Sequence, residues 1–314
     1  MTERIATRDA YGQALIELGR ELKELVVLDA DLSQSTKTAG FAKLFPERFF
    51  NMGIAEANLM GTAAGLAAAG KIPFASTFAV FATGRAFDQV RNSIAYPELN
   101  VKICATHAGI TVGEDGASHQ TLEDLALMRA LPGMTVLVPA DAPETKQVIR
   151  AAARHQGPVY VRLGRAGVPV VCDGDYEFKL GEIATLRSGC DLTVFACGFM
   201  VAVALEAAEH LARKGISAQV VNAATVKPLN VQQVAQAAAQ TGAVVTCEEH
   251  SIIGGLGSAV AEVLAEHCPV PLERVGVKDV FGQSGKPTEL LELYGLTAKD
   301  VGAAAERVLA RKRI

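Results

Sequence analysis

The chain has 314 residues, of which 50% are hydrophobic, and a net charge of −4 at pH 7. This length predicts one or two domains, each able to bury its own core, and the high apolar share favours surface that is buried between subunits. The modest negative charge, without a basic run before the short RKRI tail, argues against nucleic acid or an anionic membrane as a partner.

The chain begins with MTERIATRDA, which carries charges where a signal peptide needs an apolar core. Lys71 and Arg85 interrupt the longest apolar stretches before these reach the length of a membrane span. The six cysteines are scattered without CxxC spacing, which favours reduced thiols over disulfides or a metal site. We therefore expect a soluble cytoplasmic protein with no membrane segment and no metal site of its own.

Five short runs rich in valine and isoleucine alternate with helical patterns in the first half of the chain. The runs are typical of buried strands: LVVLDADL (25–32), IPFAST (72–77), NVKICAT (100–106), MTVLVPA (134–140) and PVYVRL (158–163). This alternation predicts an α/β domain over residues 1–170, built as an open, mostly parallel sheet with helices on both faces.

A polar, glycine-containing segment, VVCDGDYEFKLGE, then breaks the alternation and predicts a linker over residues 171–185. A second series of strand-like runs follows, separated by helical patterns: DLTVFACG (191–198), ISAQVVNA (216–223), AVVTCEE (243–249) and PLERVGV (271–277). The second half therefore predicts another α/β domain over residues 186–314, with the same sheet architecture.

Polar clusters follow three strands of the first domain, at the edge where parallel α/β sheets bind ligands. DADLSQST follows LVVL, STFAVF follows IPFA, and ATHAGITVGEDGASHQ follows NVKIC. The third cluster holds two histidines, two carboxylates and three glycines between His107 and His119, and Arg165 follows the last strand. Each residue alone has an ordinary structural explanation, such as a turn cap for Asp115 or a surface charge for Arg165. Their clustering is what predicts a site.

The order of the motifs resembles the C-terminal half of transketolase, which comprises a pyrimidine-binding domain and a small C-terminal domain. The motifs are ATRDAYGQAL, DADLSQST, NMGIAEANLMGTAAGLAAAG, STFAVF, ATHAGITVGEDGASHQTLEDLALMRALPG, PAD and YVRLGR. The resemblance covers nearly the whole chain and is most specific over residues 50–165. In the second domain, CEEHSIIGGLGSAVAE is also similar to deoxyxylulose-phosphate synthase and to the beta subunits of 2-oxoacid dehydrogenases.

The family's diphosphate domain carries a Gly-Asp-Gly motif followed by Asn ligands for a divalent metal, and the chain has no counterpart of it. The one candidate, CDGDYE, lies in the predicted linker without an Asn partner. The resemblance therefore implies one subunit of a split transketolase. It implies thiamine diphosphate as cofactor, Mg²⁺ or Ca²⁺ held by an N-terminal partner subunit, and an α2β2 assembly.

The implied activity is transfer of a two-carbon ketol unit from a ketose to an aldose, with or without a phosphate group on either sugar. A subunit like deoxyxylulose-phosphate synthase or a 2-oxoacid dehydrogenase beta chain is an alternative within the same cofactor chemistry. A non-catalytic partner subunit that retains the fold is an alternative from another class. His107 together with GEDGASHQ favours transketolase, while Glu56, His119 and Arg165 together favour a catalytic subunit.

Glu56 is the one carboxylate in the otherwise apolar or small stretch 51–70. It matches the family's acid that hydrogen-bonds N1′ of the aminopyrimidine ring, a contact that favours the imino tautomer acting as the base. Such an acid works best when it keeps its proton, and small apolar neighbours favour the protonated form by desolvation. The alternative interpretation is an acid that stabilises a helix N-terminus through the helix dipole.

Phe78 and Phe81 match the aromatic residues that stack on and enclose the aminopyrimidine. Gly84 stands where the family has a third aromatic residue, which leaves open whether Phe87 fills that wall.

The remaining site residues are implied by the same matching. His119 would hydrogen-bond the donor sugar and shuttle protons, a task suited to a side chain that titrates near neutrality. Asp115 would bind a sugar hydroxyl. Four residues would bind the acceptor phosphate: Arg8, Ser35, His107 and Arg165. The two guanidinium groups among them would give charge-assisted contacts.

Overall fold

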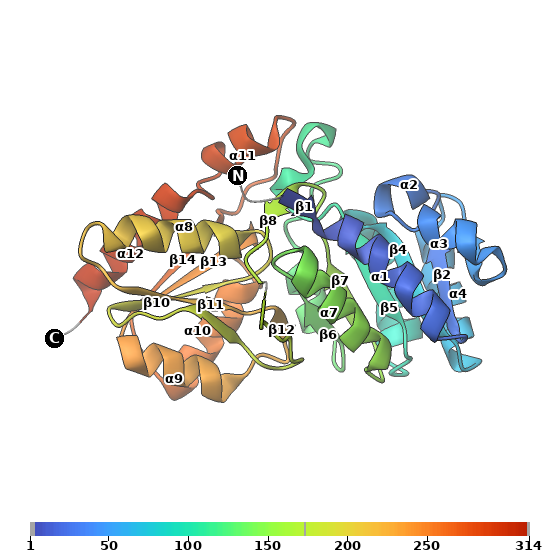
Figure 1. Cartoon of the computed structure of the whole chain (residues 1–314), viewed down its shortest axis with the longest axis horizontal. Helices are drawn as coiled ribbons and strands as arrows, with labels where there is room; N and C mark the ends of the chain where they lie inside the picture. The colour runs from blue at the N-terminus through green and yellow to red at the C-terminus, as the bar shows by residue number, and fades with distance from the viewer. Residues whose placement is uncertain (1–3, 173, 313–314) are drawn as a thin grey trace.

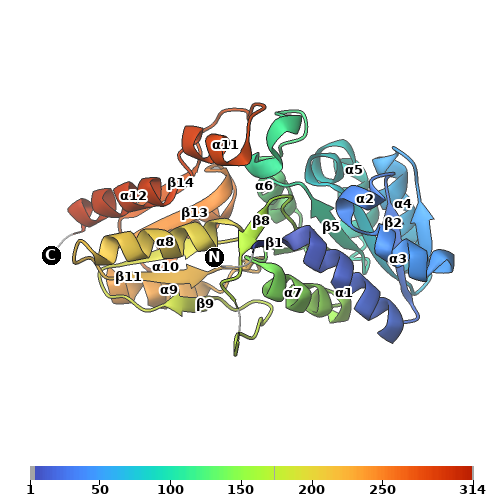
Figure 2. The same ribbon diagram turned by 45° about the horizontal axis from the view of Figure 1, so that its top comes forward.

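The computed structural model describes residues 4–172 and 174–312. The first three residues, Asp173 of the expected linker and the last two residues of the RKRI tail lie outside this part of the chain. Two sheets, each covered by helices on both faces, stand side by side (Figures 1 and 2). The expected fold class is therefore confirmed.

The first sheet has the strand order β12-β6-β7-β5-β4-β2-β3, and all neighbours are parallel except β12 and β6. Its strands are β2 (Leu25–Asp29), β3 (Phe49–Asn51), β4 (Ile72–Phe78), β5 (Lys102–Thr106), β6 (Thr135–Leu137), β7 (Val159–Arg162) and β12 (Thr225–Lys227). Its helices are α1 (Thr7–Glu21), α2 (Ser33–Thr36), α3 (Ala39–Leu44), α4 (Glu56–Ala68), α5 (Phe87–Gln89), α6 (Asp124–Ala130) and α7 (Ala142–Arg154). Short irregular helical turns span Pro46–Arg48, Phe81–Arg85, Val90–Ala95 and Ile110–Asp115.

The second sheet has the strand order β14-β13-β10-β11-β9, with only β9 antiparallel. Its strands are β9 (Ala184–Arg187), β10 (Leu192–Ala196), β11 (Ala218–Asn222), β13 (Val244–Ser251) and β14 (Leu272–Val277). Its helices are α8 (Met200–Ala212), α9 (Val231–Thr241), α10 (Leu256–His267), α11 (Pro287–Leu293) and α12 (Ala298–Arg311). A separate two-stranded ladder pairs β1 (Arg4–Ala6) with β8 (Gly167–Pro169).

All nine strand-like runs of the sequence form strands: β2, β4, β5, β6, β7, β10, β11, β13 and β14. The sequence patterns missed short strands whose formation depends on pairing. β12 is an example, because these three residues from the second half of the chain add an antiparallel edge to the first sheet. No helix in the described ranges combines the length and apolar character needed to cross a membrane.

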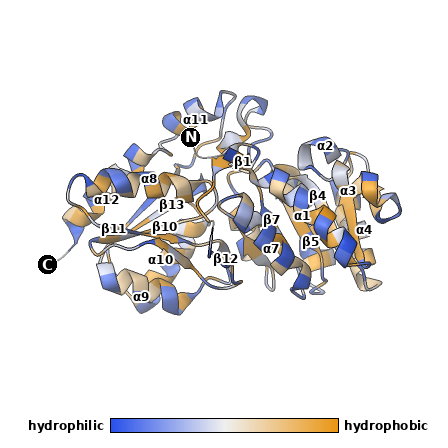
Figure 3. Ribbon diagram, in the orientation of Figure 1, coloured by the Kyte–Doolittle hydropathy of each residue, from blue (hydrophilic) through white to orange (hydrophobic). Residues whose placement is uncertain are grey.

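Buried apolar side chains form three clusters around the two sheets. Figure 3 shows apolar residues along the strands of both sheets. The cluster beneath α1 and α7 covers one face of the first sheet and includes Tyr11 and Val148. The cluster on the opposite face includes Leu59 of α4 and continues without a break to Phe195 and Val260 of the second domain. This shared core fixes the two domains against each other, so loops of the first domain meet side chains of the second at defined positions.

Candidate active site

Glu56 is the first residue of α4, and its side chain is 2% exposed. Both carboxylate oxygens lie 2.9 Å from Nη1 of Arg85, which is half exposed. The expected apolar surround is therefore incomplete, because a guanidinium group faces the carboxylate. The sequence motifs did not single out Arg85. The sequence feature that could have identified Arg85 is its position one helical turn after Phe81, in the same loop as the aromatic pair.

Phe78 ends β4 and Phe81 lies in the turn that follows. Their rings are stacked 5.9 Å apart with an interplanar angle of 12°, and the guanidinium of Arg85 lies 4.3 Å from the centre of the Phe81 ring. A Cβ atom at Gly84 would meet nothing within 4 Å, so the position of the family's third aromatic residue is open space. Phe87 packs instead against the core beside α4.

This end of the site fits a flat nitrogen heterocycle. Two parallel aromatic rings offer stacking surface, and a buried carboxyl group lies at the start of the adjacent helix. A pyrimidine ring needs both features, so the residues present suit the pyrimidine end of thiamine diphosphate. Among the described residues, no group of three or more His, Cys, Asp and Glu side chains is placed to hold a metal ion.

Two histidines border the aromatic pair. The His119 ring stands edge-on to Phe81, with centroids 5.4 Å apart, and the His107 ring stacks on Phe78 at 3.7 Å. His107 is buried, and its Nε2 lies 3.1 Å from Nη1 of Arg8. A guanidinium can only donate, so Nε2 is the acceptor and the Nδ1–H group donates to Oγ1 of Thr106 at 2.8 Å.

The neutral tautomer of His107 agrees with its surroundings. Burial, followed by the positive charges of Arg8 and Arg165, lowers the pKa of His107 to about 3. His107 thus acts as a hydrogen-bonding group and not as a cation at neutral pH.

We expect the His107 ring to show no titration between about pH 5 and 8. An unfolded chain would bind a proton near the ordinary histidine pKa of 6.5, and the folded chain rejects that proton down to about pH 3. The contribution of His107 to the free energy of unfolding is therefore full above pH 6.5 and falls as the pH drops below it. NMR of the ring resonance, assigned with a His107→Asn variant, measures the titration. A midpoint above about pH 5 would contradict the assignment.

Positively charged side chains gather around His107, and we call Arg8, Lys37 and Arg165 the cationic cluster. Nη1 of Arg8 also donates to the backbone carbonyl of Ser35 at 3.0 Å, so Ser35 contributes its carbonyl and not its hydroxyl to this contact. Burial lowers the pKa of Arg8, and the nearby charge of Arg165 lowers it further. Lys37 has a left-handed backbone with φ of 70° and was not singled out by the sequence motifs.

Arg165 lies at the outer side of the cluster. Its Nη1 donates to the carbonyl of Val112 and lies 3.5 Å from the carboxylate of Asp115 and 3.6 Å from that of Glu114. Asp115 is exposed, and it thus partners a cation at the rim of the site. Two guanidinium groups near a neutral imidazole are an arrangement that can bind an anion, although Glu114 and Asp115 already contact one of them.

The structure brings all the residues expected from the sequence to one place. Arg85 contacts both Glu56 and Phe81. Ring contacts then lead from Phe81 through His119 and Phe78 to His107. Arg8 contacts both His107 and Ser35. The carboxyl ends of β2, β4, β5 and β7 meet at this edge, because parallel neighbours end on the same side of the sheet. The site thus has an acid with an aromatic wall at one end and a cationic cluster at the other.

Two family models match the chain. Residues 3–170 match the model of the transketolase pyrimidine binding domain, and residues 181–301 match that of the transketolase C-terminal domain. The chain therefore belongs to the transketolase family.

Three similar proteins match this chain over nearly their whole length. A putative transketolase C-terminal section of Methanocaldococcus jannaschii is 54% identical, with 96% of this chain and 95% of the relative covered. A 6-deoxy-6-sulfo-D-fructose transketolase subunit of a Clostridium species is 48% identical, with 97% and 95% covered. A solved structure described as a split gene transketolase, an inactive beta4 tetramer, is 62% identical with a TM-score of 0.93, covering 98% of this chain and all of that one.

Proposed function

We propose that this chain is the pyrimidine-binding subunit of a cytoplasmic, thiamine-diphosphate-dependent transketolase. The enzyme would move a two-carbon ketol unit from a ketose to an aldose, each with an anionic end group such as phosphate. The observation that carries the proposal is the continuous set of contacts from buried Glu56, across Phe78 and Phe81, to Arg8 and its cationic cluster. The relative named for a sulfonated fructose supports an anionic sugar, since sulfonate and phosphate both suit guanidinium groups.

Thiamine diphosphate, when bound, supplies the carbon atom that carries the two-carbon unit between the two sugars. Glu56 binds and orients the pyrimidine ring through N1′ and shares a proton with it. Phe78 and Phe81 hold the ring flat and exclude water from one face. His119 has its Nδ1 2.9 Å from Oγ of Ser118, which orients the ring so that Nε2 exchanges protons with the sugar.

Arg85 would act at the pyrimidine end as well. Its guanidinium lies over the Phe81 ring and fixes the position of the Glu56 carboxylate. Gly84, the residue before Arg85, leaves open space where the family has an aromatic residue, and we infer that the flat, charged guanidinium of Arg85 takes over that wall.

The diphosphate and its Mg²⁺ or Ca²⁺ would be held by an N-terminal partner subunit, in an α2β2 assembly. The exposed face of α4 supports self-association, because small residues leave it flat: Ala57, Gly61, Gly65 and Ala68. No heavy atom lies within 4 Å of a Cβ built on Gly61 or Gly65, so another backbone can approach closely. The tetramer described for the 62% identical structure also supports contact between copies of this chain.

Arg165→Lys tests the anion site. We expect the KM for phosphorylated acceptors to rise about tenfold with kcat nearly unchanged, because lysine offers a point charge without the planar fork of arginine. Acceptors without phosphate should be affected little. Initial rates with phosphorylated and non-phosphorylated aldoses, in the presence of the partner subunit, measure both effects.

Arg154→Lys is the matched control, since Arg154 is an exposed arginine at the end of α7 and outside the site. It should leave both KM values unchanged. An equal loss for both kinds of acceptor in Arg165→Lys would remove the phosphate assignment.

A further inference from the structure

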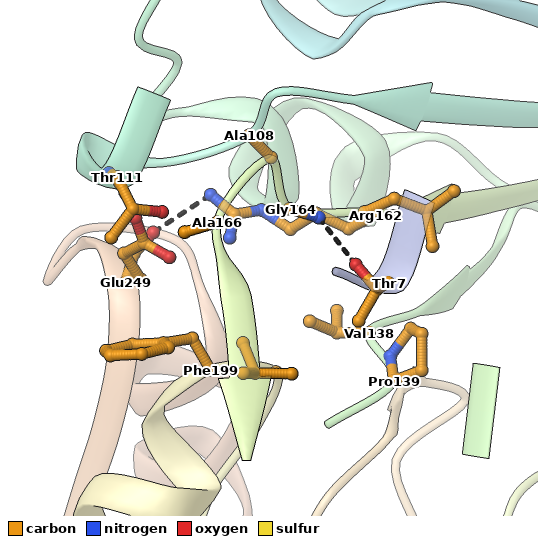
Figure 4. Close-up of a pocket in the computed structure, with 13 residues that line it drawn as sticks. Thr7, Ala108, Thr111, Val138, Pro139, Arg162, Gly164, Ala166, Phe199 and Glu249 are labelled. Carbon is orange, nitrogen blue, oxygen red and sulfur yellow. Dashed lines mark hydrogen bonds between the residues drawn. The ribbon is translucent and has the colours of Figure 1, made fainter. Parts of the chain in front are cut away.

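The loop that carries three of the proposed substrate residues lies against the second domain. We call residues 107–120 the substrate loop, because it holds His107, Asp115 and His119. Thr111 of this loop donates its backbone N–H to Oε1 of Glu249 at 2.7 Å, in a buried contact. Figure 4 shows the two residues beside each other. Glu249 belongs to β13 of the second domain, so a carboxylate of one domain fixes the loop of the other.

Glu249 lies at a narrow junction between the domains. With Thr111 and Arg162 it lines a cavity of about 20 Å³, which has room for roughly one water molecule. Nη2 of Arg162 donates to the backbone carbonyl of Glu249 at 2.9 Å. The junction therefore holds both the main chain and the side chain of Glu249 in place.

Glycines allow the two domains to approach this closely. A Cβ on Gly109 would lie 2.4 Å from Oε1 of Glu249, and one on Gly116 would lie 2.5 Å from Oγ of Ser284. On the second domain, a Cβ on Gly282 would lie 1.9 Å from Oε1 of Gln120. All three contacts join the substrate loop to the second domain, and a side chain at any of these positions would have to displace the side chain that it meets.

The backbone of the substrate loop needs outside support. His107 has a φ of 58°, and three loop glycines also have positive φ: Gly109, Gly113 and Gly116. A left-handed conformation at a non-glycine residue is strained and persists only where the surroundings enforce it. Nε2 of Gln120 contacts the carbonyls of Ile110 and Gly113 within the loop and that of Gln283 in the second domain. Figures 1 and 2 show α11 beside the turn Ile110–Asp115.

We propose that Glu249 is a positioning residue through which the second domain holds the substrate loop in the geometry that binds the sugar. The role of the loop in binding sugar rests on the proposed function. The role of Glu249 in holding the loop rests on the contacts described above.

The charge of Glu249 supports a role beyond stability. Burial raises the pKa of Glu249, and the charge of Arg162 and the N–H of Thr111 only partly oppose this. Because the carboxyl pKa is higher in the folded chain than in the unfolded chain, ionisation of Glu249 lowers the free energy of unfolding. The loss is complete at pH above the folded pKa and absent at pH below the unfolded pKa. A buried carboxylate that costs stability near neutral pH is typical of functional positions.

Glu248 offers a matched control one residue away. It is also buried, but its carboxylate oxygens accept the N–H groups of Leu256 and Gly257 at the start of α10, at 2.6 and 2.8 Å. These contacts stay within the second domain.

The test compares hydrogen exchange of the full chain in four forms: wild type, Glu249→Ala, Glu249→Gln and Glu248→Ala. Exchange in the 108–116 segment should rise about tenfold or more in Glu249→Ala, because a charge-assisted hydrogen bond is lost. Glu249→Gln should stay close to wild type, since its amide oxygen still accepts from Thr111. Glu248→Ala should raise exchange at residues 254–260 and leave 108–116 unchanged. If Glu248→Ala does not fold, Glu248→Gln replaces it.

Kinetics of the same variants with the partner subunit give the second measurement. In Glu249→Ala we expect kcat/KM for the sugar to fall about 10- to 100-fold, mainly through KM, while affinity for thiamine diphosphate changes less than about twofold. Loop exchange in Glu249→Ala equal to wild type, or sugar and cofactor affinities weakened alike, would overturn the positioning role. A wild type that turns over no sugar with its partner would instead overturn the proposed function, while the exchange result would still decide whether Glu249 holds the loop.

Discussion

Glu56→Gln is expected to keep the fold and the subunit assembly while slowing proton exchange at the thiazolium C2 of bound cofactor roughly 10²- to 10⁴-fold. Glutamine has nearly the shape of glutamate and still hydrogen-bonds N1′ of the pyrimidine. It does not readily share a proton with that nitrogen, so the base that removes the C2 proton is scarcely formed. Deuterium exchange at C2, followed by NMR on the enzyme reconstituted with its partner, measures the rate.

The competing explanation is that Glu56 only stabilises α4 through the helix dipole and its contact with Arg85. In that case the variant should lose roughly 0.3–1 kcal/mol of stability and keep near-normal exchange. Glu289→Gln is the matched control, because Glu289 lies in the first turn of α11 and also faces a cation, Lys286, at 3.7 Å. Normal C2 exchange in Glu56→Gln together with a lowered Tm would defeat the catalytic assignment.

The chain alone is expected to show no transketolase turnover and to bind thiamine diphosphate weakly. Its site suits the pyrimidine end of the cofactor, and a diphosphate needs a metal ion or fixed donors to balance its charge. Addition of the diphosphate-domain subunit should restore turnover and tighten cofactor binding.

Titration of the purified chain with that subunit, with calorimetry for cofactor binding and a coupled assay for sugar transfer, tests this dependence. Omission of the divalent metal serves as the control, because it should abolish the gain. Robust turnover by this chain alone, in a sample that mass spectrometry shows to be free of any partner, would refute the division of the enzyme into two subunits.

Strand periodicity was enough to predict the two sheets. Buried parallel strands are continuous apolar runs, so LVVLD and VYVR were recognisable without knowledge of their neighbours. β12 was not recognisable, because Thr225–Lys227 becomes a strand only by pairing with β6 of the other domain. Short edge strands take their conformation from a partner, and the partner is distant in the sequence.

Motif order predicted most of the residues that gather at the site, but not Arg85 or Lys37. The polar clusters after β2, β4 and β5 had to meet, because the carboxyl ends of parallel strands lie at one edge. That rule and the family resemblance together placed Glu56, Phe78 and His119 in one site.

The tertiary structure alone decided what each group faces. Three contacts show this: Arg85 with Glu56, Arg8 with the neutral His107, and Glu249 with Thr111. Each joins segments that are distant in the sequence, by 138 residues in the case of Thr111 and Glu249. Charges and hydrogen bonds act over a few ångströms, so their effect on a group depends on which side chains fold next to it. The sequence by itself determined the fold class and the site residues that its motifs name. Packing within the first domain added Arg85 and Lys37 and determined the charge environment of the site, and contact between the two domains determined the support of its loop.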